Sequence, residues 1–302
     1  MPPAEASPGP GSRLVAASRS APGGRGAAPQ GVIEVAGLTK RYRGAARNAV
    51  DGVSFEVAEG QLFCLLGPNG AGKTTTVSLL TTTLALTGGR VRIAGHDLAT
   101  GQARVRREIG VVFQQPSLDL NLTAEQNIRL HAVLYGLYPW RPAWRLMPAA
   151  YRRQVAELAE ILGLAGALGR PARALSGGTR RKLEILRALL HQPRVLFLDE
   201  PTTGLDPHSR RGLWAYLRQV RATHATTIFL TTHYLAEAED ADAICVLARG
   251  QVIERGSPAE IKARQLAAVR PRAADDTAGR RTLEDAYLAL LEAAGRGAAG
   301  PR

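Results

Sequence analysis

The sequence predicts an α/β fold in which helices cover both faces of a parallel sheet. Short, fully apolar runs recur along the chain and are separated by segments with helical periodicity, which is the pattern of parallel strands joined by crossover helices. A glycine-rich turn links one of these apolar runs to a helix. Polar residues directly follow several of the other runs, at the strand ends where ligands bind in such sheets.

Size and composition allow a buried core but no membrane-spanning helix. The chain has 302 residues, of which 45% are hydrophobic, enough for one large core or for a core with attached subdomains. No apolar run reaches the roughly 18 to 20 uncharged residues of a bilayer span. Two cysteines, Cys64 and Cys245, both lie in apolar runs. We therefore expect buried, reduced thiols of a cytosolic protein, and neither neighbourhood resembles a metal site.

The excess positive charge is concentrated in the middle of the chain. The formal net charge is +13 and the sequence pI is about 10.6. Residues 139–194 contain eleven Lys or Arg and three Asp or Glu, a net charge of +8. A basic balance is compatible with nucleic acid, with an anionic membrane surface, or with an arginine-rich composition that meets only solvent. Composition alone leaves these alternatives open.

The chain divides into three parts by composition and periodicity. Residues 1–30 are rich in Pro, Gly, Ala and Ser without apolar periodicity, so we expect a disordered extension. Residues 31–257 hold the strand patterns and form the predicted main domain, with a mostly helical subdomain at about 117–190. Residues 258–302 form a C-terminal extension with a short predicted helix at about 282–292.

The strand patterns fall into two groups. Val32–Val35 alternates and takes Val53–Val57 as its hairpin-type neighbour, and Val91–Gly95 is a further strand that ends in a turn. The apolar runs predict buried strands at Leu62–Leu66, Val111–Phe113, Val195–Leu198 and Thr227–Leu230, with a hairpin from Ala243–Leu247 and Gln251–Glu254. Helices are predicted at three places. The first follows the glycine-rich turn, over Thr74–Leu86. The second opens at the capping box of Thr123 and Gln126, and the third begins at Tyr151.

A complete G-x-x-x-x-G-K-[ST] run links the strand at 62–66 to the next helix. The run and its neighbour are Gly67, Pro68, Asn69, Gly70, Ala71, Gly72, Lys73, Thr74 and Thr75. The glycines let backbone N–H groups turn toward one point, at which the positive end of the helix dipole is also aimed. Lys73 can then reach the β- and γ-phosphates of a nucleotide, and Thr74 can bind Mg²⁺. The alternative, a glycine-rich turn without a ligand, is disfavoured because the whole motif is in register.

Polar residues at other strand ends fit the same chemistry. Asp199 and Glu200 follow an apolar strand, so Asp199 can hold Mg²⁺ and Glu200 can orient or deprotonate the attacking water. Gln114 can contact the metal and this water, and His233 can bond a γ-phosphate oxygen. Upstream of the loop, Tyr42 can stack on an adenine ring. Without the P-loop, each of these residues would be read as an ordinary polar or half-exposed side chain.

Along the chain, the P-loop is followed by Gln114, by a Ser-Gly-Gly element, by Asp199 with Glu200, and by His233. Motifs in this order resemble those of the ATP-binding cassette (ABC) ATPases. The element that separates this family from other P-loop proteins is Leu175-Ser176-Gly177-Gly178, placed before a basic helix and the acidic strand. The resemblance covers about residues 32–257. It implies a P-loop NTPase (RecA-like) core with a parallel sheet, an N-terminal antiparallel β subdomain and an inserted α-helical subdomain.

The same resemblance implies a dimer with shared sites. Ser176, Gly177 and Gly178 of one subunit would close over ATP and Mg²⁺ held on the P-loop of a second subunit, in a homodimer or a heterodimer. Thr179 stands where the family usually has Gln. Because this position lies beyond the residues that touch phosphate, we expect tuning of activity and not its loss.

Residues 113–119, 232–239 and 282–288 resemble the ATPase subunits of ABC-2 type exporters, the drug- and polysaccharide-export group. This implies ATP hydrolysis coupled to transport through a separate integral membrane permease, drug or antibiotic efflux, and a peripheral position on the cytoplasmic face of the membrane. In this family the helical subdomain faces the membrane partner. The charge of residues 139–194 therefore suggests contact with anionic lipid, with a solvated arginine-rich face as the alternative.

Two other functions are disfavoured by the sequence. A soluble ABC ATPase acting on DNA or ribosomes would carry a long coiled coil or two cassettes, and the chain has neither a heptad run nor a second P-loop. We therefore expect no nucleic-acid partner. A scaffold that binds nucleotide without hydrolysing it is the other alternative, and Glu200 argues against it.

Overall fold

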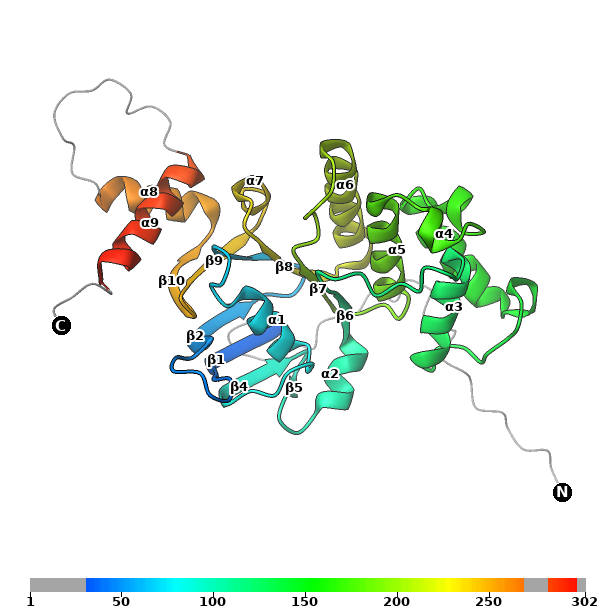
Figure 1. The fold of residues 1–302 in the computed structure, drawn as a ribbon, viewed down its shortest axis with the longest axis horizontal. Coiled ribbons are helices and arrows are strands. Elements are labelled where there is room, and N and C mark those ends of the chain that lie inside the picture. The colour runs from blue at the N-terminus through cyan, green and yellow to red at the C-terminus, as the bar shows by residue number, and fades with distance from the viewer. Residues whose placement is uncertain (1–30, 269–281, 298–302) are drawn as a thin grey trace, which may run out of the picture. The chain divides into compact units, whose positions relative to one another are not determined.

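The computed structural model describes residues 31–268 and 282–297 (Figure 1). They form two compact units: a helical unit, Leu118–His191, and a sheet unit made of Gly31–Ser117 and the described residues from Gln192 onward. The expected disorder of residues 1–30 lies outside the described residues, as do residues 269–281 and 298–302 of the predicted C-terminal extension.

A six-stranded sheet forms the centre of the sheet unit. Its strands are β3 (Leu62–Leu66), β6 (Ile109–Val112), β7 (Val195–Asp199), β8 (Thr227–Thr232), β9 (Ala243–Ala248) and β10 (Gln251–Gly256). The order is β10-β9-β3-β8-β7-β6, with β10 antiparallel to β9 and the other five strands parallel. Every residue of β3, β7 and β8 is buried, as expected of strands covered on both faces. The predicted parallel sheet is confirmed.

A second, antiparallel sheet is built from the N-terminal part of the unit, with two strands before β3 and two after it. Its strands are β1 (Ile33–Lys40), β2 (Val50–Val57), β4 (Gly88–Ile93) and β5 (His96–Asp97), in the order β2-β1-β4-β5. The two sheets share one hydrophobic core. Phe55 of β2 lies 5.2 Å from Phe63 of β3 and 5.8 Å from Phe229 of β8, measured between ring centroids. Such ring contacts add about 0.5–1.5 kcal/mol each beyond the area they bury.

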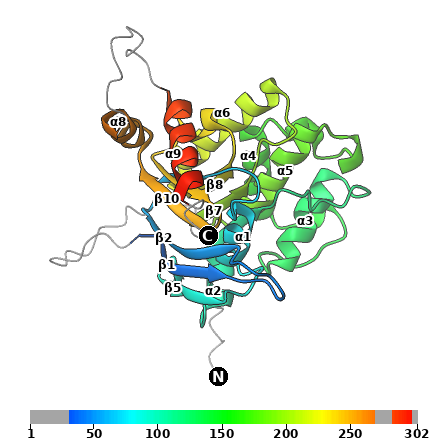
Figure 2. The same cartoon turned by 60° about the vertical axis from the view of Figure 1, so that its left-hand side comes forward.

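Helices complete the sheet unit. They are α1 (Lys73–Leu80), α2 (Gln102–Glu108), α6 (Pro207–His224), α7 (Leu235–Ala238), α8 (Pro258–Ala268) and α9 (Leu283–Gly297). Figures 1 and 2 both show α9 against α8 and β10, and these elements are in contact. Among the described helices, none has both the length and the apolar character needed to cross a bilayer.

The helical unit contains three α-helices and three short 3₁₀ turns: α3 (Ala124–Leu134), η1 (Trp144–Leu146), α4 (Ala149–Ile161), η2 (Ala165–Ala167), η3 (Ala172–Ala174) and α5 (Gly177–Leu189). The predicted capping box opens α3: the Gln126 amide N–H donates to Thr123 Oγ1, and the Thr123 N–H donates to Gln126 Oε1. Tyr151 is completely buried in α4 and contacts Tyr138 and Trp144 edge-on.

Two helix ends differ from the prediction. α1 ends at Leu80, six residues before Leu86, because Thr81 turns its hydroxyl back to the Val77 carbonyl and Thr82 adopts a left-handed conformation (φ 61°). α9 extends to Gly297, beyond residue 292.

Helix α8 has no counterpart in the prediction. It starts with a reciprocal capping box in which the Glu260 N–H donates to Ser257 Oγ and the Ser257 N–H donates to Glu260 Oε2. Pro258 stands at its first position, where proline is favoured. The Ser-x-x-Glu spacing was therefore the missed sequence signal.

Candidate functional site

Four adjacent strand ends bring the predicted site residues to one edge of the parallel sheet. Gly67 follows β3, His233 follows β8, Asp199 ends β7, and Gln114 comes two residues after β6. Because β3, β8, β7 and β6 are consecutive and parallel, their carboxyl ends lie side by side. Residues from four distant parts of the sequence therefore surround one point.

The P-loop backbone requires glycine at specific positions. Gly72, the N-cap of α1, has φ 105°, and Gly70 has φ 77°, values that favour glycine. A Cβ on Gly67 would lie 2.3 Å from the Leu247 carbonyl oxygen, and one on Gly72 would lie 2.5 Å from that of Ala49. The loop is thus packed against its surroundings and fixed in shape, with the N-terminus of α1 behind it.

Lys73 is held inside this loop. Its side chain is 4% exposed, and Nζ donates to the carbonyl oxygens of Gly67 at 2.8 Å and Pro68 at 3.2 Å. Nζ also lies 3.4 Å from Glu200 Oε1. The ammonium group is therefore already desolvated and aimed at the point that the strand ends surround.

Asp199 is almost completely buried, and it is surrounded by hydroxyl groups. Thr231 Oγ1 donates to Asp199 Oδ1 at 2.5 Å, and Thr74 Oγ1 donates to the same oxygen at 3.4 Å. Burial raises the pKa of the Asp199 carboxyl; the hydrogen bonds from Thr231 and Thr74 oppose this without cancelling it. A buried carboxylate beside a hydroxyl offers hard oxygen ligands, which suit Mg²⁺.

Glu200 lies at the centre of the group. Its Oε1 lies 3.4 Å from His233 Nδ1, and Gln114 Nε2 donates to its Oε2 at 3.2 Å. Burial alone would raise the pKa of this carboxyl, but the neighbouring Lys73 and His233 outweigh it and hold the pKa below its ordinary value. The side chain is therefore a carboxylate at neutral pH, as a general base must be.

The backbone of Glu200 is unusual. Its φ is 44°, a left-handed conformation that is uncommon outside glycine. Its N–H donates to both the carbonyl oxygen and the hydroxyl of Thr231, so the neighbouring strand holds this conformation. Backbone strain of this kind concentrates at functional sites.

The remaining P-loop residues surround this group. Pro68, Asn69, Gly70 and Ala71 form the loop between β3 and α1, and Thr75 is in the first turn of the helix. The Tyr42 hydroxyl lies 3.3 Å from Thr75 Oγ1, and Tyr42 as a residue is 45% exposed. An exposed ring tied to the start of α1 is compatible with the predicted stacking on a base.

The Ser-Gly-Gly element belongs to the helical unit, whereas the strand-end residues belong to the sheet unit. Ser176 is the N-cap of α5 and its hydroxyl accepts from the Thr179 N–H at 3.2 Å. Ser176 and Gly177 are exposed and Gly178 is buried. Ser176 Oγ also lies 2.8 Å from Thr179 Oγ1, so the Thr179 departure adds a hydroxyl contact to the cap.

Sequence reasoning missed two threonines of the site. Thr231 bonds both Asp199 and the Glu200 backbone, and Thr203 Oγ1 donates to Glu200 Oε2 at 3.2 Å. The signal for Thr231 was a hydroxyl residue at the end of an otherwise apolar strand. Thr203 had no signal beyond its closeness to Glu200.

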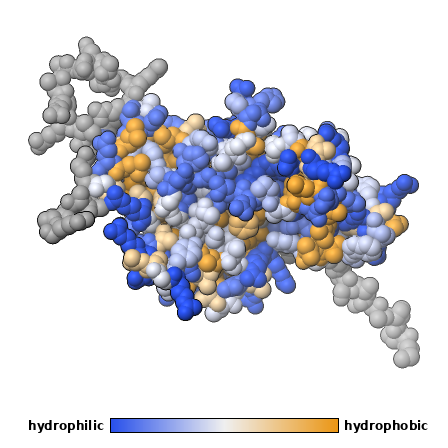
Figure 3. Space-filling view, in the orientation of Figure 1, coloured by the Kyte–Doolittle hydropathy of each residue, from blue (hydrophilic) through white to orange (hydrophobic). Residues whose placement is uncertain are grey.

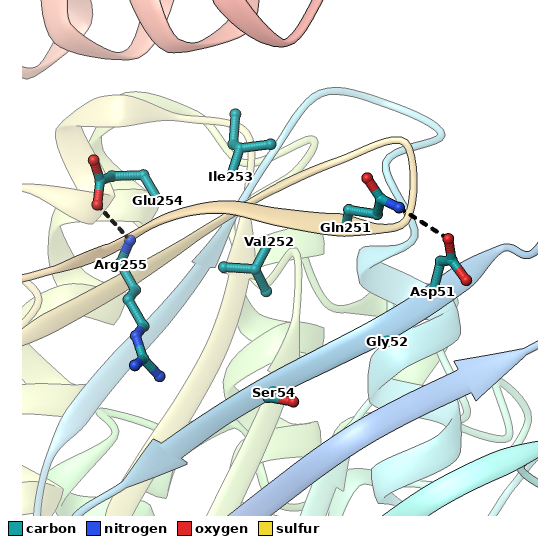
Figure 4. A pocket seen from close by; sticks show the side chains of 8 residues that line it. All are labelled: Asp51, Gly52, Ser54, Gln251, Val252, Ile253, Glu254 and Arg255. Carbon is teal, nitrogen blue, oxygen red and sulfur yellow. Dashed lines mark hydrogen bonds between the residues drawn. The ribbon is translucent and has the colours of Figure 1, made fainter. Parts of the chain in front are cut away.

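A shallow groove elsewhere in the sheet unit contains none of these residues. It has a volume of about 560 Å³ and lies between the edge strands β2 and β10 (Figure 4). Across it, Gln251 Nε2 donates to Asp51 Oδ2 at 2.9 Å. This bond joins β10 to β2, so the groove is a junction between the two sheets.

Comparison with known proteins points to one family. Residues 50–203 match the family model described as "ABC transporter". Over 235 residues the chain is 43% identical to the daunorubicin/doxorubicin resistance ATP-binding protein DrrA of Streptomyces peucetius, covering 78% of this chain and 68% of that protein. It is 41% identical over 241 residues to the Nod factor export ATP-binding protein I of Ralstonia nicotianae, covering 80% and 71%.

A solved structure shares the fold. It is a dimeric ATP-binding cassette in a post-hydrolysis state, bound to ADP and Pi. The TM-score is 0.65 at 26% identity, and the match covers 74% of this chain and 98% of that chain.

Proposed function

The chain belongs to the ABC transporter family, and from this premise we propose that it is the ATP-hydrolysing subunit of an exporter. It drives transport through a separate membrane permease, and the transport is drug or antibiotic efflux. One observation carries the proposal. A single edge of the parallel sheet brings together the side chains of Lys73, Asp199, Glu200, Gln114 and His233. The names of the two relatives, resistance and export ATP-binding proteins, favour export over the soluble alternative.

Each of the converging residues has a role in cleavage of the γ-phosphate. The P-loop N–H groups and Lys73 bind the phosphates, as backbone amides and ammonium groups do at helix N-termini. Glu200 orients or deprotonates the attacking water, which its lowered pKa permits. Gln114, 3.2 Å from Glu200, contacts the same water. His233 donates a hydrogen bond to a γ-phosphate oxygen.

Mg²⁺ fits the donors present beside the loop. Thr74 Oγ1 and Asp199 Oδ1 lie 3.4 Å apart, and these two oxygens, with the side-chain oxygen of Gln114, would hold the ion. Within residues 31–268 and 282–297, no cluster of three or more His, Cys, Asp or Glu side chains could hold a metal alone. This agrees with Mg²⁺, which keeps waters and phosphate oxygens as ligands. When bound, the ion neutralises charge on the phosphates.

The working assembly that we propose is a pair of ATPase subunits, identical or different, on a permease at the cytoplasmic face of the membrane. Ser176, Gly177 and Gly178 of one subunit close over the nucleotide of the other. The dimeric cassette with ADP and Pi supports this arrangement, because this chain shares its fold. No nucleic-acid partner is proposed.

We further propose that the segment 139–148 of the helical unit meets anionic lipid. Trp140 and Leu146 are 62% and 58% exposed, and the exposed Arg141 and Arg145 lie beside them in the sequence. Tryptophan with flanking arginine is typical of a membrane interface. The chain has no acidic residue between Glu125 and Glu157, so nothing in this stretch repels an anionic surface. The solvated face remains the alternative.

Removal of the P-loop lysine tests the ATPase role. Lys73→Ala removes the ammonium that binds the phosphates, so ATP turnover should fall about 100-fold or more, and efflux by cells that express the chain with its permease should stop. ATP hydrolysis by purified protein and drug accumulation in cells measure the two effects. Lys262→Ala, which removes a surface ion pair with Glu239, is the control and should behave as the parent. Turnover retained in Lys73→Ala would contradict the site.

A further inference from the structure

A buried carboxylate joins two loops of the site without touching the reacting groups. Glu237, in α7, is 2% exposed. Its Oε2 accepts from Thr232 Oγ1 at 2.6 Å, and its Oε1 accepts a short hydrogen bond from Thr202 Oγ1. Both threonines are 1% exposed, so all three polar groups are removed from water and depend on one another.

The two hydroxyl groups lie next to the proposed catalytic side chains: Thr202 is in the loop after β7, and Thr232 is the last residue of β8. Thr202 is two residues beyond Glu200, and Thr203 N–H donates to the Glu200 carbonyl oxygen. Thr232 directly precedes His233, and its Oγ1 also accepts from the Tyr234 N–H at 3.0 Å. One carboxylate therefore links the loop after β7 to the end of β8. These are the segments that bring Glu200 and His233 to within 3.4 Å.

Stability alone is a poor reason for a carboxylate at this place. Among the described residues, no basic side chain forms an ion pair with Glu237. A buried carboxylate without a cation is costly, and well-packed apolar side chains stabilise a core as well or better. What an apolar side chain cannot do is fix the distance between two separate loops through directional hydrogen bonds. That is the property that catalysis requires.

We propose that Glu237 is a positioning residue for ATP hydrolysis, which sets the distance of the Glu200 loop from the His233 loop through Thr202 and Thr232. The inference rests on the roles proposed above for Glu200 and His233. It predicts that loss of the link lowers kcat while the affinity for ATP, which depends on the P-loop, stays unchanged. A misplacement of about 1 Å can cost on the order of 100-fold in rate.

The experiment separates positioning from stability with two variants of the full-length chain. Glu237→Leu leaves two buried hydroxyls without an acceptor, so both Tm and kcat should fall. The triple variant Glu237→Leu, Thr202→Val, Thr232→Val removes all three polar groups with little change of shape. Its Tm should recover in part, because the Tyr234 N–H still loses Thr232 Oγ1 as its acceptor. Its kcat should remain about 10- to 100-fold below the parent, with KM for ATP within about twofold.

Conservative variants provide a rescue. Glu237→Gln keeps one oxygen and an amide group that a threonine hydroxyl can accept from, and Thr202→Ser keeps the donor, so both should retain most of the parent kcat. The control is Glu239→Leu, at the end of the same helix, where the side chain is 41% exposed and pairs with Lys262. It should leave kcat and KM as in the parent.

The outcomes distinguish the positioning role from the catalytic assignment on which it rests. A triple variant that regains kcat together with Tm would show that Glu237 is only structural. A rise in KM at constant kcat would show that the link acts on ATP binding, which also contradicts the positioning role. Glu200→Gln is measured alongside. If Glu200→Gln is slow and the triple variant is fast, only the positioning proposal is overturned. If Glu200→Gln turns over at full speed, the catalytic assignment fails, and the positioning proposal fails with it.

Discussion

At the scale of single residues, the burial of His131 makes the stability of the fold depend on pH. It lies in α3, with its ring 4.2 Å from that of Tyr135, and Tyr135 in turn lies 5.0 Å from His191. Burial lowers the pKa of His131 to about 3, and the charges of Arg187 and His191 act in the same direction. Its Nε2 has no hydrogen-bond partner among the described residues. The folded protein therefore keeps this imidazole neutral.

The stability of the fold should depend on pH through this histidine. The unfolded chain binds a proton at His131 below pH of about 6.5, whereas the folded chain does not until pH of about 3. The folded state is therefore destabilised as pH falls between these values. Between pH 7 and pH 5 the loss from this residue is about 2 kcal/mol.

The His131→Phe variant keeps the ring and removes the titration. Urea unfolding at pH 7 and pH 5 should show a smaller loss of free energy in this variant than in the parent. His208→Phe, at an exposed position of α6, is the control and should lose as much as the parent. Equal pH dependence in the parent and in His131→Phe would contradict the burial of a neutral imidazole.

At the same scale, Glu200 shows where sequence reasoning ends. An Asp-Glu pair after four apolar residues, downstream of a P-loop, was enough to propose its role. Its left-handed backbone, φ 44°, has no local sequence signal. The two acceptors of the Glu200 N–H that stabilise it both belong to Thr231, on a strand 27 or more residues away in the chain. The residue could be named from the sequence, but the direction of its side chain could not.

Helices and strands could be predicted where apolar periodicity defines them. They were predicted less well where a capping contact determines where a helix begins or ends. The buried strands and α4 follow directly from their apolar runs. The end of α1 and the whole of α8 depend on single hydroxyl and carboxylate contacts, at Thr81 and at Ser257 with Glu260. Such contacts contribute about 1 kcal/mol each to helix stability. They involve one or two residues and therefore do not change the apolar pattern from which the helices were predicted.

Buried side chains hold the segment 139–148 in place. Its inner side is anchored by Met147, 2% exposed, and by Trp144 against Tyr151 at 5.5 Å. Trp140 and Leu146 remain exposed. Figure 3 shows hydrophobic surface over the region of α3, on the right of the view. α3 itself exposes Leu134. The inner anchoring means that the exposed side chains are presented by a fixed segment.

If the segment binds lipid, the full chain should bind vesicles that contain phosphatidylglycerol more tightly than vesicles of phosphatidylcholine alone. The double variant Trp140→Ser, Leu146→Ser should weaken binding at least about tenfold, since each buried side chain contributes about 1.5–3 kcal/mol. Leu288→Ser, a 51% exposed leucine of α9, is the control. Co-sedimentation measures the binding.

Two results would contradict lipid binding. One is equal binding of the parent and the double variant to anionic vesicles. The other is a double variant that binds vesicles normally but no longer co-purifies with the permease, which would make the segment a protein contact. The double variant Arg141→Gln, Arg145→Gln tests the charge, and it should weaken binding to anionic vesicles by about 1 kcal/mol per arginine. The control is Arg211→Gln, which replaces an exposed arginine of α6.

For the whole molecule, strand order was the part of the site that local patterns could not supply. Four polar strand ends were visible in the sequence, but any order of six strands is compatible with the same apolar runs. The observed order places β3, β8, β7 and β6 side by side, and this adjacency is what turns separate residues into one site. The resemblance to ABC ATPases anticipated the fold, and the chain's membership of the family explains why that worked.

The proposed dimer is the remaining feature at this scale, and cysteine cross-linking tests it. Cys64 and Cys245 are completely buried, and burial raises the pKa of both thiols, that of Cys245 to about 12, so neither should react. Ser176→Cys and Asn69→Cys are introduced into separate protein samples at exposed positions, each in a Glu200→Gln background that slows hydrolysis. The samples are then mixed with a short bifunctional thiol reagent.

ATP should produce a cross-linked species that contains one copy of each variant, because the Ser-Gly-Gly element of one subunit would then face the P-loop of the other. Without ATP, or with Thr223→Cys, an exposed residue near the end of α6, in place of Ser176→Cys, the species should be absent. Mass spectrometry of the cross-linked peptides identifies the junction. If Ser176→Cys never joins Asn69→Cys of another copy in ATP, while both variants still bind ATP, then the nucleotide is not shared between subunits and the dimer mechanism is wrong.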